Sequence, residues 1–342
     1  MRRAFWSTTA RMGYLAAIGA AVALAGLAPP VSRAAQKAAA GGKGGGVLDR
    51  EDRILQTRDG GNLHISYYKS PGDKESPVVV LLHMKDGSRF VWQGDKGFAR
   101  RLQEQGFAVV TVDLRYHGES KVGGAVGAGN VNQGGGKKKD KKQAGLDLRP
   151  IDFEAMAEFD MQAVKGFIKD EHQAENLNMN KMGIVGPEMG ASIAVAYAAI
   201  DWDMAPYDDG PVGAQTPRGQ DVRALVLISP REKYHGMAMA KVITQLKDPA
   251  LDIAFLICCG GEAQDKKESE KVFKMAATPA INESRMFFKS YDKARLTGTD
   301  LLDKGLDLED RMLAFFDKHL KKLDAPWRNR ESRRKKLDKK KT

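Results

Sequence analysis

The feature that most constrains the fold is a series of short, continuous apolar runs that alternate with helical stretches. Residues 77–83 (PVVVLLH), 107–113 (FAVVTVD) and 253–259 (IAFLICC) are rich in β-branched residues and Leu. A strand that is apolar at successive positions is buried on both faces, which is typical of a parallel sheet covered by helices. The pattern therefore predicts an α/β fold, with a mostly parallel central sheet and helices on both faces.

The other expected elements follow the same alternation. Two alternating runs around an Asp-Gly-Gly turn at residues 59–61 predict a hairpin at the start of the domain. Further strands are expected at 182–185, 224–229 and 286–291, and helices at 98–105, 152–170, 191–200 and 306–323. Ligands of open α/β sheets gather beyond the carboxyl ends of the strands, so the loops that follow the strands are where chemistry is expected.

The N-terminal 34 residues have the pattern of a signal peptide. Basic residues precede an apolar run at 14–27, and small residues supply a cleavage site after Ala34. The run is short for a membrane span, although an uncleaved N-terminal anchor is the alternative. Because Arg2-Arg3 resembles a twin-arginine signal, we expect export to the periplasm or the medium by the Sec or twin-arginine route.

The rest of the chain divides by composition. Residues 35–50 read as a flexible leader, residues 51–325 as the folded domain, and residues 326–342 as a basic disordered tail. Two stretches are expected as loop insertions in the domain: residues 121–149, which are rich in Gly and Lys, and residues 201–220, which contain several Pro and Gly. The only cysteines, Cys258 and Cys259, are adjacent in an apolar run, so we expect buried thiols and no disulfide.

The net charge of +11 is concentrated in low-complexity segments, chiefly residues 137–142 (KKKDKK) and 328–342. Neither segment has aromatic residues between its basic ones, whereas a nucleic-acid site needs base-stacking residues or a basic folded face. We therefore expect no specific nucleic-acid partner. The Lys-rich loop and tail allow electrostatic contact with anionic surfaces.

Residues 186–190 (GPEMG) lie between an expected strand and an expected helix. A strand, a tight Gly-x-x-x-Gly turn and a helix make the frame of a nucleophile elbow, which presents one side chain at the top of a sheet. The central residue of that frame is normally a nucleophile such as Ser. Here it is Glu188.

Five ordered motifs resemble the α/β-hydrolase superfamily, in particular its esterase, serine-aminopeptidase and dienelactone-hydrolase-like members. They are LLHMKDGSRFVW (81–92), VDLRYHGES (112–120), GIVGPEMGAS (183–192), ALVLISP (224–230) and LTGTDLL (296–302). The resemblance implies an α/β-hydrolase fold, oxyanion-hole N–H groups from Met84 and Met189, and a catalytic acid at Asp265, with Glu262 as the second choice. It also implies a structural rather than catalytic role for His117.

The same resemblance implies that two of the three catalytic positions are replaced. The base is expected within residues 296–302, where Thr297 occupies the His position and has no pKa suitable for proton transfer. Glu188 occupies the Ser position, and its carboxylate lies one methylene farther from the backbone than the Asp nucleophile of some relatives. The pattern indicates a dismantled triad.

Three functional hypotheses follow. The first is an exported protein that has lost serine-hydrolase catalysis and acts in binding or as a scaffold, with the sheet-end pocket as the place for a small-molecule ligand. The second is a hydrolase that uses Glu188 and Asp265 as a non-standard catalytic set. The third is an esterase-like enzyme whose base is His235.

Charge partners for the two carboxylates are also predicted. Lys85, Arg115 and Arg295 are the expected candidates for pairing with Glu188 and Asp265. Because no His or Cys has the spacing of metal ligands, no metal or other cofactor is expected.

Overall fold

A computed structural model of the chain describes residues 50–94, 96–121, 148–261, 263–278 and 284–334. The chain divides into two units, Met1–Gly46 and Val47–Thr342, and all the described residues belong to the second. The predicted signal peptide, nearly all of the leader, most of the 121–149 insertion, Glu262 and the last eight residues lie outside the described residues. No helix within the described ranges has the length and apolar character to cross a membrane.

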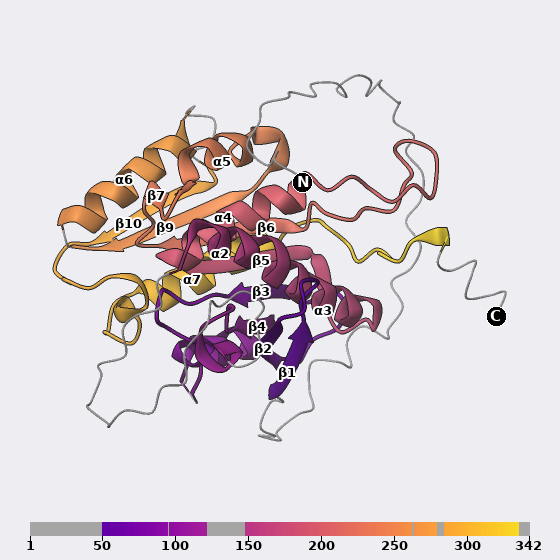
Figure 1. The fold of residues 1–342 in the computed structure, drawn as a ribbon, viewed down its shortest axis with the longest axis horizontal. Helices are drawn as coiled ribbons and strands as arrows, with labels where there is room; N and C mark the ends of the chain where they lie inside the picture. The colour runs from indigo at the N-terminus through magenta and orange to yellow at the C-terminus, as the bar shows by residue number, and fades with distance from the viewer. Residues whose placement is uncertain (1–49, 95, 122–147, 262, 279–283, 335–342) are drawn as a thin grey trace, which may run out of the picture. The chain divides into compact units, whose positions relative to one another are not determined.

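Eight strands form one sheet, in the order β1-β2-β4-β3-β5-β6-β9-β10 (Figure 1). Their bounds are Arg50–Gln56 (β1), Asn62–Tyr68 (β2), Pro77–Leu81 (β3), Ala108–Val112 (β4), Asn178–Pro187 (β5), Val222–Ile228 (β6), Ala254–Gly260 (β9) and Met286–Tyr291 (β10). Strand β2 is antiparallel to both of its neighbours, and all other pairs are parallel. The predicted hairpin and mostly parallel sheet are therefore confirmed.

Helices cover both faces of this sheet (Figure 1). Their bounds are Phe98–Glu104 (α1), Pro150–Ala155 (α2), Met161–Gln173 (α3), Met189–Trp202 (α4), Met239–Leu246 (α5), Ala263–Ala277 (α6) and Leu308–Phe316 (α7). Helices α1 and α7 pack in one apolar cluster with Val79 and Leu81 of β3, whereas α2 to α6 share the other cluster with Val78 and Val80. This alternation is the period of two that a strand buried on both faces requires.

Two helical stretches contain a wider turn that the sequence did not predict. Met156–Asp160 is a π-helical turn between α2 and α3, and Asp317–Lys321 is another after α7. The first lies within the single helix predicted at residues 152–170. It places Asp160, which is fully buried, against the loop after β4.

A short hairpin after β6 was also not predicted. Strands β7 (Lys233–Tyr234) and β8 (Met237–Ala238) pair around a two-residue turn, His235-Gly236, in which both residues have positive φ. Such a turn matches the twist of the strands that it joins. The hairpin packs on α2, because the ring of Phe153 lies 5.5 Å from that of Tyr234.

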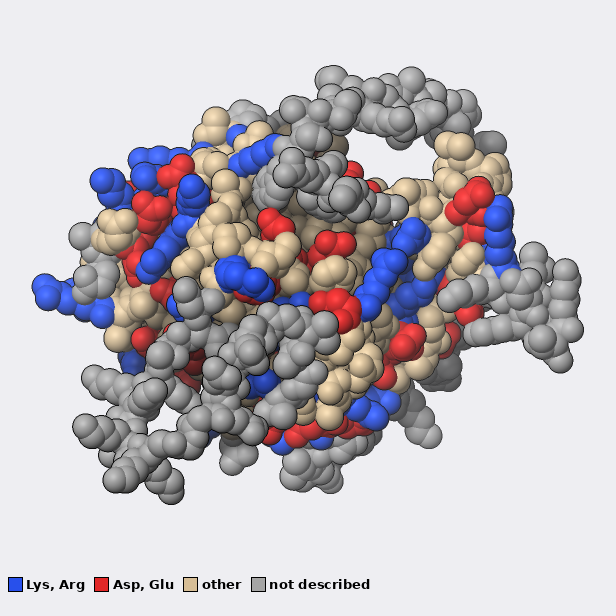
Figure 2. Space-filling view, in the orientation of Figure 1, with Lys and Arg blue, Asp and Glu red and all other residues tan. Residues whose placement is uncertain are grey.

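The expectation of a disordered tail from residue 326 is wrong for residues 326–334. Trp327 donates its indole N–H to the carbonyl oxygen of His172 at 3.0 Å, and the side chain of Arg330 forms an ion pair with Asp221. Composition alone suggested a solvated run, but these two side chains find buried partners in the domain. Elsewhere, acidic and basic side chains are interspersed on the face shown in Figure 2. Both cysteines are free and buried, as predicted.

Candidate active site

The GPEMG turn has the backbone of an elbow. Strand β5 ends at Pro187 and α4 begins at Met189, and Glu188 between them has φ 44° and ψ −104°. A positive φ is strained for a residue with a side chain and occurs mainly at functional turns. Gly186 permits the turn, because a Cβ atom at that position would lie 2.3 Å from the carbonyl oxygen of Gly190.

Glu188, Asp265 and Thr297 converge at the carboxyl edge of the sheet. Thr297 donates its hydroxyl to Glu188 Oε1 at 3.3 Å. One guanidinium nitrogen of Arg231 lies 3.4 Å from Glu188 Oε1 and 3.8 Å from Asp265 Oδ1. Arg231 therefore joins the elbow position to the acid position.

Hydrogen bonds between loops hold these side chains in place. Ser229, the residue after β6, accepts a hydrogen bond on its Oγ from the N–H of Gly298 at 3.0 Å. The N–H of Gly261 donates to the carbonyl oxygen of Ala294 at 2.7 Å, which ties the loop after β9 to the loop after β10. Asp265 itself lies in the first turn of α6, where the helix dipole favours a negative charge.

The loop that carries Thr297 packs directly on the elbow. Gly298 has φ 52°, and a Cβ atom there would lie 3.0 Å from Met84 Sδ and 3.2 Å from Glu188 Cγ. The side chains of Met84 and Glu188 therefore occupy the space beside the Gly298 backbone, and a larger residue there would have to displace them.

Comparisons with known proteins agree with this geometry at the level of the fold. No protein-family model matches the sequence, and no curated protein matches it. Among solved structures, the esterase Pf2001 of Pyrococcus furiosus superposes with a TM-score of 0.53, at 13% identity over 80% of this chain and 92% of that chain. The hypothetical protein PA2218 of Pseudomonas aeruginosa gives a TM-score of 0.50, at 15% identity over 80% of this chain and 94% of that chain.

This domain has the α/β-hydrolase fold. In the α/β-hydrolase fold, the elbow follows the strand that corresponds to β5, which is where Glu188 lies. Asp265 and Thr297, which the resemblance assigned to the acid and base positions, follow the later strands β9 and β10, and these assignments stay predictions. The oxyanion-hole roles of Met84 and Met189 stay predictions. Met189 is the first residue of α4, a position whose N–H has no acceptor within the helix.

Burial and charge act in opposite directions on the elbow carboxyl group. The pKa of Glu188 is raised above its usual value because burial disfavours the charged form, while Arg231 opposes this rise and Asp265 adds to it. Tyr234 lies close enough to feel the same charge. Burial, with a smaller contribution from Glu188, raises the pKa of Tyr234 to about 12.

The structure describes all six histidines, and none of them makes a hydrogen bond, ion pair or ring contact with Glu188, Asp265 or Thr297. His235 stacks on Phe153, with ring centroids 5.1 Å apart, and so lies on the α2 side of the hairpin. His83 is fully buried, and burial lowers its pKa to about 3. Its Nδ1 is 2.7 Å from the carbonyl oxygen of Met84, and its Nε2 accepts a hydrogen bond from the N–H of Leu114.

His117 is in a loop held by structural contacts, as the resemblance implied. Its Nδ1 lies 2.9 Å from the carbonyl oxygen of Arg115. In the same loop the hydroxyl of Ser120 donates to the carbonyl oxygen of Asp113 at 2.8 Å, and Asp113 forms a buried ion pair with Arg89. The VDLRYHGES motif (112–120) therefore builds a loop that is held by structural contacts.

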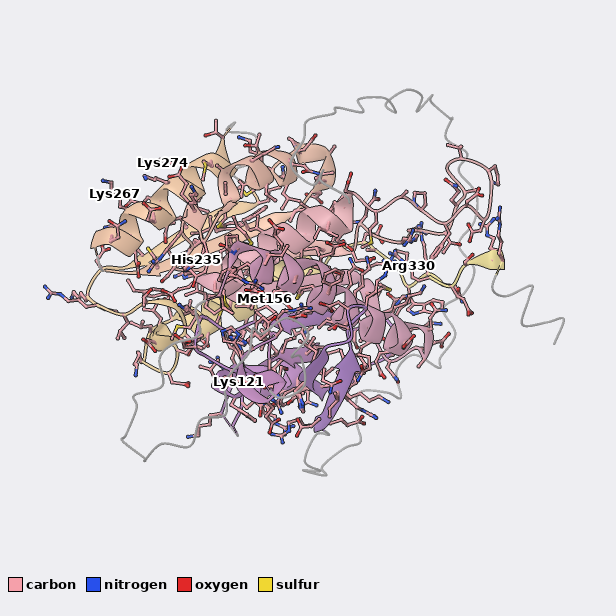
Figure 3. All side chains as sticks on the ribbon, viewed as in Figure 1. Lys121, Met156, His235, Lys267, Lys274 and Arg330 are labelled. Carbon is pink, nitrogen blue, oxygen red and sulfur yellow. The ribbon has the colours of Figure 1, made fainter. Side chains whose placement is uncertain are left out.

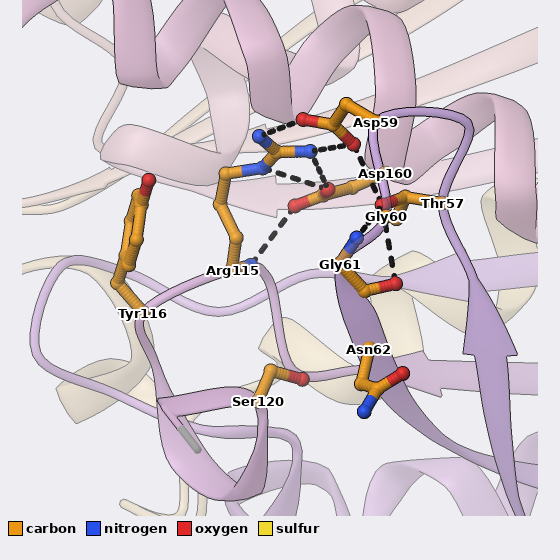
Figure 4. A pocket seen from close by; sticks show the side chains of 9 residues that line it. All are labelled: Thr57, Asp59, Gly60, Gly61, Asn62, Arg115, Tyr116, Ser120 and Asp160. Atoms are coloured by element: carbon orange, nitrogen blue, oxygen red, sulfur yellow. Dashed lines mark hydrogen bonds and ion pairs between the residues drawn. The ribbon is translucent and has the colours of Figure 1, made fainter. Parts of the chain in front are cut away.

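The predicted charge partners of the elbow are wrong. Arg115 pairs with Asp59 and Asp160 instead, at 2.7 Å each (Figure 4). Within the described ranges, neither Lys85 nor Arg295 forms an ion pair with Glu188 or Asp265. Arg231 was missed, although its place three residues after β6 puts it at the same sheet edge as the elbow.

The two best-formed cavities of the described residues lie away from the elbow. One, of about 90 Å³, surrounds the Arg115 ion pairs shown in Figure 4. The other, of about 330 Å³, is lined by Gln105, Phe107, Asp310, Leu313, Ala314, Asp317 and Lys321. Across the same residues, no group of three or more His, Cys, Asp or Glu side chains is arranged to hold a metal ion.

Proposed function

We propose that this chain is an exported α/β-hydrolase-fold protein that has lost serine-hydrolase catalysis and acts in binding or as a scaffold. The observation that carries the proposal is the contact of Arg231 with both Glu188 and Asp265. In a working triad a histidine joins the nucleophile to the acid. Here a guanidinium makes that connection, and an arginine side chain stays protonated in proteins, so it cannot serve as a base.

The chemistry of the elbow supports the same conclusion. To attack an ester, the Glu188 carboxylate would have to leave the Arg231 ion pair and the hydrogen bond from Thr297. The acyl intermediate would then need a base to activate water for its hydrolysis. Thr297 occupies the base position and cannot supply that step.

The place that remains for a ligand is the carboxyl edge around Arg231. Its side chain is 45% exposed, whereas those of Glu188 and Asp265 are 14% and 9% exposed. The guanidinium is therefore the most accessible charged group of the three. Export rests on the pattern of the N-terminal residues and is part of the proposal.

Restoration of the triad tests the loss of catalysis. The wild type is expected to show no turnover of short p-nitrophenyl esters, whereas the double variant Glu188→Ser/Thr297→His is expected to gain turnover, more so when Arg231→Ala is added. The single variant Glu188→Ser is the matched control, because it has a nucleophile without a base. Wild-type turnover that Glu188→Gln abolishes would contradict the proposal.

A second candidate is a hydrolase that uses Glu188 and Asp265 as acid and base. The observation that favours it is the raised pKa of Glu188 beside a second carboxyl group, a pattern typical of acid–base sites. This enzyme would lose activity in both Glu188→Gln and Asp265→Asn, and its rate would follow the titration of Glu188.

Export is tested separately, by the cell fraction in which the expressed protein is found and by the mass of its N-terminal peptide.

A further inference from the structure

The segment of residues 325–334, here called the C-terminal clasp, lies at the opposite edge of the sheet from the elbow. Figure 3 shows Arg330 of the clasp on the opposite side of the domain from His235, which lies in the loop after β6. The clasp contacts the amino ends of β5 and β6. The side chain of Asn178, the first residue of β5, donates to the carbonyl oxygen of Ala325 at 2.8 Å.

Arg330 is the deepest charged residue of the clasp, with 4% of its surface exposed. Its guanidinium forms an ion pair with Asp221, donates to Asn180 Oδ1 at 2.9 Å and donates to the carbonyl oxygen of Gly219 at 3.0 Å. Asp221 is fully buried and also contacts Lys165 Nζ at 2.9 Å. The clasp therefore supplies one of the two cations that neutralise a buried carboxylate.

The clasp also holds the loop at residues 203–221. The backbone N–H of Arg333 donates to Asp209 Oδ2 at 2.9 Å, and its side chain donates to the carbonyl oxygen of Ala214 at 2.7 Å. Arg334 adds an exposed ion pair with Asp208 at 3.0 Å. Release of the clasp would therefore free this loop.

His172 of α3 is the residue around which the clasp is fastened. Its ring stacks on Trp327, with centroids 4.9 Å apart, and its carbonyl oxygen accepts the Trp327 indole N–H. Its Nδ1 accepts a hydrogen bond from the N–H of Met179 at 3.2 Å, so Nε2 carries the proton that donates to the carbonyl oxygen of Arg328 at 2.7 Å. These two bonds fit the neutral imidazole with its proton on Nε2, and Nδ1 also lies 3.2 Å from the carbonyl oxygen of Leu177.

The surroundings of His172 disfavour a second proton. Burial lowers its pKa, and the positive charge of Arg330 lowers it further, whereas the hydrogen bonds to the carbonyl oxygens of Arg328 and Leu177 and the charge of Glu75 oppose the change. A proton on Nδ1 would turn toward the carbonyl oxygen of Leu177 and would leave the N–H of Met179 without its bond to that atom.

We propose that residues 325–334 form a releasable clasp and that proton uptake by His172 opens it and frees the loop at 203–221. The direction of the pH effect follows from the linkage between proton binding and clasp opening. The open state binds the proton more readily than the clasped state, so the clasp weakens as the pH falls through the ordinary histidine range, about 6.5.

The indole N–H signals in ¹H–¹⁵N spectra of the full-length protein test the proposal. The Trp327 signal, assigned with Trp327→Phe, is expected to move toward the position of a solvent-exposed indole as the pH is lowered from 7.5 to 5.0. Trp92 donates to the carbonyl oxygen of Leu82, and its signal should stay unchanged as the internal control for the fold. A Trp327 signal that does not move over this range would overturn the proposal.

Two variants separate a histidine switch from general acid sensitivity. His172→Gln is expected to abolish the pH-dependent movement of the Trp327 signal, whereas the matched control His64→Gln should leave it intact. If His172→Gln fails to fold, as judged by the Trp92 signal, the pKa of His172 is measured instead from its ring protons in Trp327→Ala and in the wild type. Loss of the stacked indole should raise the His172 pKa, and an unchanged pKa would contradict the coupling.

Discussion

Removal of the Arg330 guanidinium provides a quantitative test of the clasp. In Arg330→Met, Asp221 stays buried and keeps its ion pair with Lys165, which also pairs with Asp201, and the aliphatic part of the side chain is largely preserved. The matched control is Arg334→Met. Arg334 forms its ion pair with Asp208 at the surface, where the two side chains are 69% and 87% exposed.

The expected magnitudes differ because burial differs. Loss of one partner of a buried ion pair lowers the free energy of unfolding by about 3–5 kcal/mol. Because the Lys165 contact remains, we expect about 3 kcal/mol for Arg330→Met. An exposed pair contributes about 0–1 kcal/mol, which sets the expectation for Arg334→Met. At about 2–4 °C per kcal/mol for a domain near this size, Arg330→Met should lower the Tm by about 6–12 °C.

The assay is thermal unfolding of both variants and the wild type at pH 8.0 and pH 5.5. Burial raises the pKa of Asp221 to about 6, so this carboxyl group is charged at pH 8.0 and largely protonated at pH 5.5. A buried charge without a partner destabilises the fold only while it is charged. The drop in Tm caused by Arg330→Met should therefore be larger at pH 8.0 than at pH 5.5. Equal Tm values for the two variants, or a larger loss at pH 5.5, would refute the reasoning.

Three further predictions concern the elbow. Gly298→Ala should lower the free energy of unfolding in urea by about 1–2 kcal/mol, because a φ of 52° is unfavourable for Ala and the new Cβ contacts Met84 and Glu188. An unchanged urea midpoint would disprove this packing. The stability advantage of Glu188→Gln over the wild type should be larger at pH 8 than at pH 4. The raised pKa of Glu188 means that folding favours its protonated form, so the wild type loses stability as the pH rises. An advantage that grows toward acidic pH would contradict the raised pKa. Arg231→Gln should raise the pKa of Glu188 further, as measured by ¹³C carboxyl titration, and a lowered pKa would exclude the ion pair.

Much of the fold was readable from the sequence, because strands buried on both faces leave a continuous apolar run. The runs at 77–83 and 107–113 predicted β3 and β4 within two residues at each end. The hairpin of β7 and β8 was missed because two-residue strands leave no periodicity. Its turn uses His235 with a positive φ, in place of the Asn or Asp that usually marks such a turn.

The elbow was predicted from its strand–turn–helix frame, whereas Asp265 and Thr297 were predicted from the resemblance to the α/β-hydrolase superfamily. The three residues converge because the ends of parallel strands share one edge. Arg231 was not predicted, because nothing in the local sequence shows which of several nearby cations will reach the carboxylates. Arg115 was a plausible partner but is held by two closer carboxylates. The clasp was missed for a related reason. In the sequence a basic run resembles a solvated tail, and only the structure shows that Arg330 forms an ion pair with the buried Asp221.

The loss of serine-hydrolase catalysis is tested most directly by a fluorophosphonate probe on the wild-type protein. Intact-mass and peptide analysis then report whether any serine carries the label, with a known esterase treated in parallel as the positive control. Because Glu188 occupies the elbow and Thr297 the base position, no serine should be labelled. Stoichiometric labelling of one serine, together with ester turnover that the probe abolishes, would contradict the account.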